Sequence, residues 1–176
     1  MTTLHRLRET WRTRKALRTA AELVGMLALV TVVGAYQTRE HPRGALPALS
    51  LRTLDGAATT LAPWRGRTTV LEVWAPWCGV CKAQTDNLAR ARRWLGARAN
   101  VISVAASYQD VDEVRRSPLA QHDGVTVLLG DEDFTRRLRV RAFPTVFVLD
   151  ARGRVVSSVQ GYTTTLGLVL RALWYG

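Results

Sequence analysis

The chain is organised around the stretch Trp74-Ala75-Pro76-Trp77-Cys78-Gly79-Val80-Cys81-Lys82, which holds the only two cysteines among 176 residues. Residues 69–74 are apolar and β-branched except for Glu72, a composition that predicts a buried strand. The residues after the cysteines predict a helix, because apolar positions 81, 88, 91 and 95 keep helical spacing until Gly96 ends the pattern. We therefore expect the two thiols at the junction between a buried strand and a helix.

This position has chemical consequences for the thiols. The first turn of a helix has unpaired N–H groups and a partial positive charge, which would stabilise a thiolate at Cys78. Thiols in such settings have pKa values of about 3.5 to 7.5, compared with about 8.5 for a free cysteine. Cys81 lies one turn further in and can attack a mixed disulfide formed at Cys78. We interpret Cys78 as the nucleophile and Cys81 as the resolving thiol.

Two other roles for the cysteine pair are open. Half of a zinc site would need further ligands, and only His5, His41 and His122 could help, so a second ligand pair is missing and we expect no metal. A structural disulfide would close a very short loop, to which the chain-entropy model assigns little stabilisation. Both roles are less favoured than redox chemistry.

The cysteine-containing stretch resembles the active-site segment of the thioredoxins. Glu72 stands six residues before Cys78, where thioredoxins carry a buried Asp, and Phe143-Pro144-Thr145 is similar to their cis-proline loop. Residues 150–153 resemble the turn of the last hairpin. The resemblance covers roughly residues 46–176. It implies an α/β thioredoxin-like fold, with a central mixed β-sheet flanked by helices.

The resemblance also implies how a substrate would bind. In thioredoxins the backbone before the cis-proline pairs with the substrate chain beside the disulfide, a form of β-augmentation. Pro144 would occupy that position, and Phe143 and Trp77 would add contacts beside Cys78. The alternative is that Phe143-Pro144 is merely the entry to a strand.

Glu72 is the remaining candidate for a catalytic role. A lone carboxylate in an apolar strand is costly unless it is paired or protonated, and burial should raise its pKa. We interpret Glu72 as the group that takes the proton from Cys81 as that thiol attacks. The alternative is that the strand turns Glu72 to solvent or onto an Arg. ResA-like proteins often carry a Glu three residues after the second cysteine, and here that position is Gln84.

The N-terminal residues predict a membrane anchor. Residues 1–19 carry six Lys and Arg against Glu9 alone, and the positive-inside rule places such a flank in the cytoplasm. Residues 20–36 are the predicted transmembrane signal anchor, although the uncharged part, 23–36, is shorter than the roughly 20 residues of a full span. A cleaved signal peptide, with Val33-Gly34-Ala35 at the cleavage site, and a soluble buried helix are the alternatives.

Residues 37–47 are predicted to be a linker, and residues 48–176 a single domain. Segments 49–54 and 57–61 flank Asp55-Gly56, which predicts a hairpin. This extra hairpin resembles the TlpA- and ResA-like membrane-anchored branch of the thioredoxins. Further strands are expected at 101–106, 125–129, 145–149 and 154–159.

Helices are expected at 111–122, interrupted by Ser117-Pro118, and after Asp131. A final helix is expected after Thr163 or Thr164, and its predicted apolar face consists of Leu166, Val169, Leu170 and Leu173. The stretch 161–174 resembles the end of the ScsD-type proteins, of the suppressor-of-copper-sensitivity group.

The net charge of +11 does not indicate nucleic-acid binding, because no recognition motif accompanies the scattered basic residues. The predictions together describe a monomeric thiol–disulfide oxidoreductase in the bacterial inner membrane, with its domain in the periplasm. It would act on the thiols and disulfides of substrate proteins with no cofactor beyond the Cys78–Cys81 pair. The TlpA and ResA resemblance implies a reductant, which needs a membrane dithiol electron donor. The alternative is a redox-inert adaptor or copper-handling protein. The function of an adaptor would be kept in Cys78→Ser, whereas that of a catalyst would be lost.

Overall fold

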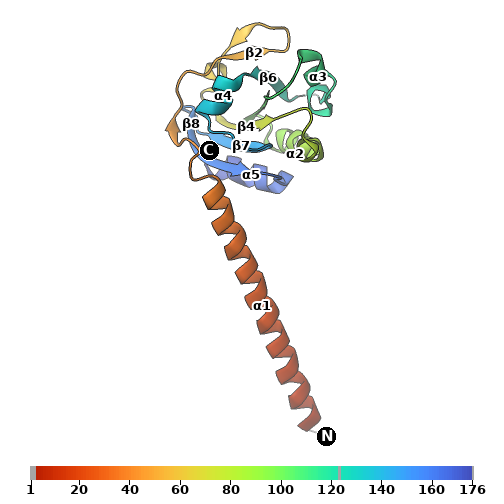
Figure 1. Ribbon diagram of the computed structural model, residues 1–176. Coiled ribbons are helices and arrows are strands. Elements are labelled where there is room, and N and C mark those ends of the chain that lie inside the picture. The colour runs from red at the N-terminus through yellow and green to blue at the C-terminus, as the bar shows by residue number, and fades with distance from the viewer. Residues whose placement is uncertain (1–2, 123, 176) are drawn as a thin grey trace. The chain divides into compact units, whose positions relative to one another are not determined.

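The computed structural model describes residues 3–122 and 124–175. The chain divides into two compact units, and the boundary along the sequence lies between Arg39 and Glu40. The first unit is one helix, α1 (Thr3–Gln37), coloured red to orange in Figure 1. Its part Leu17–Gln37 is long and apolar enough to cross a membrane, by length and composition alone. A signal sequence would have the same properties, so the anchor over 20–36 stays a prediction.

The second unit contains an eight-stranded mixed sheet within the described residues. The strand order is β1-β8-β7-β4-β5-β6-β2-β3, and central strand β4 runs parallel to β5 and antiparallel to β7. The strands are β1 (Gly44–Ala45), β2 (Leu51–Thr53), β3 (Ala58–Thr59), β4 (Thr68–Trp74), β5 (Ala99–Ala105), β6 (Thr126–Gly130), β7 (Thr145–Leu149) and β8 (Arg154–Gln160). The predicted extra hairpin is confirmed as β2 and β3.

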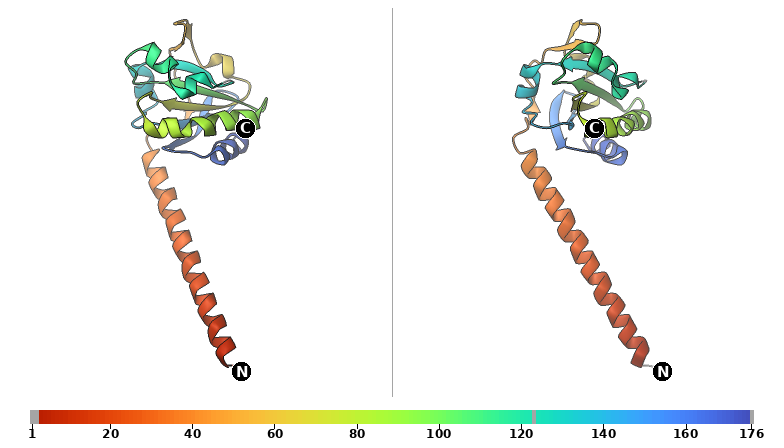
Figure 2. Two further views of the ribbon diagram at one scale, coloured as in Figure 1. Left: turned by 90° about the vertical axis from the view of Figure 1, so that its right-hand side faces the viewer. Right: turned by 45° about the vertical axis from the view of Figure 1, so that its right-hand side comes forward.

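Helices lie on both sides of the sheet, and Figure 2 shows α2 and α5 side by side. The α-helices of this unit are α2 (Gly79–Leu95), α3 (Val111–Arg115), α4 (Glu132–Arg137) and α5 (Thr165–Trp174). Short 3₁₀ helices, η1 (Ala62–Trp64) and η2 (Pro118–Gln121), complete it. The predicted helix over 111–122 is therefore two elements, because Pro118 starts a new turn after the Ser117 cap.

The alternation of side chains along β4 divides the core into two clusters. Val70 and Trp74 belong to the cluster that contains α2 and α5 residues, whereas Leu71 and Val73 belong to the cluster that contains Phe134 of α4. Successive residues of a strand point to opposite faces of the sheet. Glu72 therefore faces the same side as Val70 and Trp74, beneath α2.

The apolar face predicted for α5 is not the face that packs into the core. Leu166, Leu170 and Leu173 are exposed, whereas Leu168, Val169 and Ala172 are buried against α2 and β4. Both stripes of this helix are apolar, so helical periodicity alone does not distinguish them. The Thr164 hydroxyl caps the helix, as expected, by accepting a hydrogen bond from Gly167 N at 3.2 Å.

The stretch predicted to be a linker, 37–47, contributes to the folded unit from Glu40 onward. Strand β1 pairs with β8, and the buried His41 contacts Ser158 Oγ through Nδ1 at 3.0 Å. Burial lowers the pKa of His41, and the positive charge of the nearby Arg141 lowers it further. The linker interpretation rested on Pro42, Gly44 and Pro47, but an edge strand tolerates proline and glycine near its ends.

Candidate active site

The cysteine pair lies where it was expected, between β4 and α2. Cys78 is the N-cap of α2, and its Sγ accepts a hydrogen bond from Cys81 N at 3.1 Å. The two cysteines form a disulfide, with 5.3 Å between their Cα atoms. Cys78 is 7% exposed and Cys81 is 2% exposed, so Cys78 is the more accessible sulfur. The order of exposure supports the predicted roles of nucleophile and resolving thiol.

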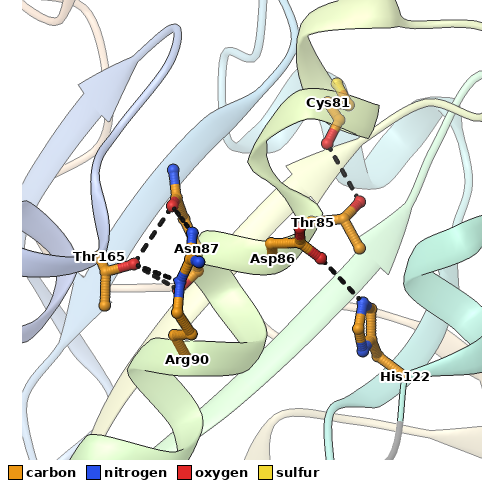
Figure 3. Close-up of polar contacts among 7 residues, drawn as sticks. All are labelled: Cys81, Thr85, Asp86, Asn87, Arg90, His122 and Thr165. Carbon is orange, nitrogen blue, oxygen red and sulfur yellow. Dashed lines mark hydrogen bonds and ion pairs between the residues drawn. The ribbon is translucent and has the colours of Figure 1, made fainter.

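Polar contacts hold the start of α2 in place (Figure 3). Thr85 Oγ1 donates to the carbonyl oxygen of Cys81 at 3.3 Å. Asp86 Oδ1 lies 3.3 Å from His122 Nε2, so one of the three histidines considered as zinc ligands contacts a carboxylate at the surface instead. These contacts fix the turn of helix that follows the resolving thiol.

A second group of contacts joins α2 to the segment that precedes and begins α5 (Figure 3). Asn87 Nδ2 donates to the carbonyl oxygen of Thr163 at 3.2 Å. The side-chain oxygen Oδ1 of Asn87 accepts from Arg90 Nη2 at 2.8 Å and from Thr165 Oγ1 at 3.2 Å. The two helices on this face of the sheet are thus connected by buried side chains as well as by apolar packing.

The loop that contains Pro144 approaches the same end of β4. The Phe143–Pro144 peptide bond is cis. Thr145, the first residue of β7, pairs with Val73, so Pro144 lies level with the end of β4, where the cysteine-containing stretch begins. The carbonyl oxygen of Pro144 accepts a hydrogen bond from Gly161 N at 2.8 Å. The strand register therefore brings the predicted substrate-binding loop to the cysteine pair.

Trp77 and Phe143, both predicted to bind substrate, are brought together by the fold. Their rings meet edge to face with centroids 5.7 Å apart. The indole Nε1 of Trp77 donates to the carbonyl oxygen of Ser107 at 2.7 Å, although the side chain is 60% exposed. Ser107 adopts a left-handed conformation, with φ of 55°, which is uncommon outside glycine.

A groove of about 720 Å³ opens beside these two rings. The other residues that line it were not predicted from the sequence. Its charged residues are Asp131 and Glu132, and no Lys or Arg lines it among the described residues. Burial and Asp131 raise the pKa of Tyr108 in its wall, and Arg52 opposes this shift. The segments after β5 and β6 could have been found from sequence, because the carboxyl ends of parallel strands share one edge. The lining residues are Trp77, Ser107, Tyr108, Gln109, Gly130, Asp131, Glu132, Thr135, Val140 and Phe143.

Glu72 is fully buried, so the alternative that it faces solvent or an Arg is wrong. Its Oε1 accepts a hydrogen bond from Gln84 Nε2 at 2.7 Å, and its Oε2 has no hydrogen-bond partner among the described residues. Burial raises the pKa of Glu72 to about 8, and the Gln84 hydrogen bond opposes this shift. The carboxyl group can therefore gain or lose a proton near neutral pH.

Gln84 is a residue whose importance the sequence did not reveal. It is completely buried, and its Oε1 accepts a hydrogen bond from Thr163 N at 2.6 Å. The sequence shows that Gln84 stands three residues after Cys81 on a predicted helix. Its contact with Glu72 could not be predicted, because this contact depends on how α2 crosses β4.

Comparison with known proteins places this site in a family. The model of the Redoxin family matches residues 42–167. The chain belongs to the Redoxin family.

Individual relatives of this Redoxin domain are also thioredoxin-like or thiol:disulfide interchange proteins. Thioredoxin-like protein YneN of Bacillus subtilis (strain 168) is 24% identical over 121 residues, covering 68% of this chain and 71% of YneN. The thiol:disulfide interchange protein DsbE of Pseudomonas fluorescens biotype C is 30% identical over 119 residues, covering 65% of this chain and 64% of DsbE.

The structure of the exposed lipoprotein thioredoxin of Streptococcus pneumoniae strain TIGR4 is similar with a TM-score of 0.65 and 19% identity, covering 73% of this chain and 99% of that one. The thioredoxin-like fold is thus confirmed. The predicted class of disulfide oxidoreductase is also confirmed, because the matched family and relatives are of that class. None of these matches bears on the ScsD-type resemblance, which stays a prediction.

Proposed function

We propose that this Redoxin-family protein is a membrane-anchored reductant that exchanges its Cys78–Cys81 disulfide with partner proteins outside the cytoplasm. The observation that carries the proposal is the disulfide at the start of α2, with the more exposed sulfur at the helix N-cap. A helix N-terminus stabilises a thiolate, and a stabilised thiolate is the attacking species in disulfide exchange.

The proposed reaction has two steps. The Cys78 thiolate of the reduced protein attacks a disulfide of the partner, which forms a mixed disulfide and releases one partner thiolate. Cys81 then loses its proton and attacks Cys78 Sγ, which forms the Cys78–Cys81 disulfide and releases the second partner thiolate. Two electrons pass from the protein to the partner, and Glu72 in its ionised form accepts the Cys81 proton.

The groove supplies the substrate contacts in this proposal. A partner chain would pair with the backbone beside Pro144, and its side chains would contact the Trp77 and Phe143 rings. The two acids of the groove favour a partner segment that carries basic residues near its cysteine.

The proposed location rests on the apolar part of α1 and its basic flank. The span Leu17–Gln37 has the length of a transmembrane helix, and the six basic residues of 1–19 would remain in the cytoplasm. The domain would then face the periplasm, as a monomer attached to the inner membrane. A reductant there needs electrons from a membrane dithiol donor, because that compartment is oxidising.

The reduction potential of the full chain in detergent, measured in glutathione or dithiol buffers, tests this proposal. A value near −270 mV, similar to that of thioredoxin, is expected for a reductant. A value near −120 mV would make the protein an oxidant and overturn the proposed direction. A Cys78–Cys81 pair that does not titrate reversibly would overturn the redox function itself.

A further inference from the structure

The orientation of the Gln84 amide is fixed by a backbone group. Thr163 N can only donate, so the atom of Gln84 that lies 2.6 Å away must be its carbonyl oxygen. The amide nitrogen of Gln84 therefore faces Glu72 Oε1, 2.7 Å away. If the oxygen and nitrogen of the Gln84 amide were exchanged, two donors would face each other at Thr163. The orientation of the amide is therefore unambiguous.

This orientation decides which oxygen of Glu72 is an acceptor. The Gln84 N–H group donates to Oε1, so a proton on Oε1 would face another proton. The other oxygen, Oε2, is buried and has no partner among the described residues. Most buried polar atoms in proteins are paired, so an unpaired one calls for an explanation.

We propose that Gln84 is a positioning residue that makes Oε2 the atom of Glu72 that carries and exchanges the proton. The proposal rests on the proposed role of Glu72 in proton transfer to and from Cys81. Gln84 and Cys81 lie one helical turn apart on α2, so the residue that holds Glu72 moves with the resolving thiol. The charged form of Glu72 keeps its bond to Gln84, while Oε2 alone changes its protonation.

The segment that orients Gln84 also contacts the substrate-binding loop. Gly161 N donates to the carbonyl oxygen of Pro144 at 2.8 Å, and two residues later Thr163 N donates to Gln84. Asn87 of α2 holds the same segment through the carbonyl oxygen of Thr163. One three-residue segment thus supports both the Pro144 loop and the amide that positions Glu72.

Infrared spectroscopy of the oxidised full chain tests the assignment directly. A protonated carboxyl group absorbs at a lower frequency when its carbonyl oxygen accepts a hydrogen bond, so Gln84→Met should shift the Glu72 carboxyl band to higher frequency. The band is identified by its loss in Glu72→Gln. Arg93→Met, at an exposed position of the same helix, is the matched control and should leave the band unchanged. An unchanged band in folded Gln84→Met would overturn the proposal.

Kinetics provide the second measurement. Because the Gln84 hydrogen bond lowers the pKa of Glu72, its loss in Gln84→Met should move the pH profile of mixed-disulfide release upward and slow release about tenfold at pH 7. Gln84→Glu, which keeps the length and an acceptor for Thr163 N, covers the case in which Gln84→Met does not fold. Its added carboxyl group should also displace the profile, and a wild-type profile in the folded variant would overturn the proposal.

The two proposals can fail separately. If Glu72→Gln releases mixed disulfides at the wild-type rate between pH 6 and 8, the proton-transfer role of Glu72 is wrong. The infrared shift in Gln84→Met would still show that Gln84 places the proton on Oε2. If Glu72→Gln is slow but Gln84→Met has a wild-type profile, the proton-transfer role stands and the positioning role of Gln84 is wrong.

Discussion

Trp77 and Phe143, which lie 66 positions apart in the sequence, meet edge to face with their ring centroids 5.7 Å apart, and both line the groove. Trp77 comes from the start of the cysteine-containing turn, and Phe143 precedes the cis-proline. The exposed Trp77 ring, supported by the partly buried Phe143 ring, provides an aromatic surface near the disulfide that a partner chain can cover.

Substitution of Phe143 by Ala should weaken substrate binding without changing the disulfide chemistry. Loss of the aromatic contact removes about 0.5–1.5 kcal/mol, so we expect KM for a disulfide-containing protein substrate to rise roughly two- to tenfold. The reduction potential should remain unchanged. Steady-state kinetics and a glutathione titration measure the two quantities, and Trp94→Ala, at an exposed site of α2, serves as the control. An altered potential with an unchanged KM would contradict this role for Phe143.

The two cysteines should behave differently when each is replaced by serine. Cys81→Ser should accumulate mixed disulfides with partner proteins, because Cys78 can attack but no thiol can resolve the product. Cys78→Ser should accumulate few or none, since the remaining sulfur is 2% exposed. Non-reducing electrophoresis of extracts from cells that express each variant shows the adducts. Adducts of equal abundance in the two variants would mean that the assignment of roles is wrong.

The stability of the oxidised protein should fall as the pH rises from about 4.5 to about 8. In this window Glu72 is ionised in the unfolded chain but keeps its proton in the folded protein, because burial raises its pKa to about 8. The folded state then binds more protons than the unfolded state, so the free energy of unfolding decreases with increasing pH. The total decrease from Glu72 should be a few kcal/mol.

Urea unfolding at several pH values measures this effect, and Glu72→Gln provides the reference. The difference in free energy of unfolding between the two proteins should change with pH only in that window. The disulfide must stay oxidised throughout, so that neither thiol titrates. A difference that is constant from pH 4.5 to 8 would mean that Glu72 has an ordinary pKa.

Gly130, which lines the groove at the end of β6, should not tolerate a side chain. A Cβ atom there would lie 2.7 Å from Cδ1 of Phe134 and 2.8 Å from Cγ1 of Val104. Both neighbours are fully buried, so Gly130→Ala should cost about 1–3 kcal/mol of stability. Gly79→Ala is the matched control, because its Cβ would meet no atom within 4 Å. Equal unfolding midpoints in urea for the two variants would contradict the expected clash.

Local signals in the sequence predicted the elements that carry the chemistry. The helix after Cys78 ends at Leu95 before Gly96, as the spacing of apolar residues indicated. Asp131 caps α4 by accepting a hydrogen bond from Phe134 N at 2.8 Å. Glu72 was singled out because a carboxylate stands out in an apolar strand. Capping, periodicity and a misplaced charge are all properties of a few neighbouring residues.

The features that sequence reasoning missed depend on contacts between distant segments. The apolar face predicted for α5 differs from its buried face, which includes Leu168 and Ala172, because the helix is apolar on both sides. Gln84 appeared only as a departure from the ResA-like pattern, and its significance comes from the meeting of α2, β4 and the segment before α5. The acidic wall of the groove comes from residues after β6, more than 50 positions away from Trp77. Pairings of this kind are set by the topology of the sheet.

The two cysteines also limit the disulfides that the chain can form while it folds. A chain with two cysteines has one way to form an intramolecular disulfide, so oxidation before folding is complete cannot link the wrong partners within the chain. The cores on the two sides of the sheet rest on apolar packing and hydrogen bonds, with this one bridge confined to a single helical turn. The packing of the two cores is thereby largely independent of this bridge, so a newly made molecule can fold before its cysteine pair is oxidised or reduced.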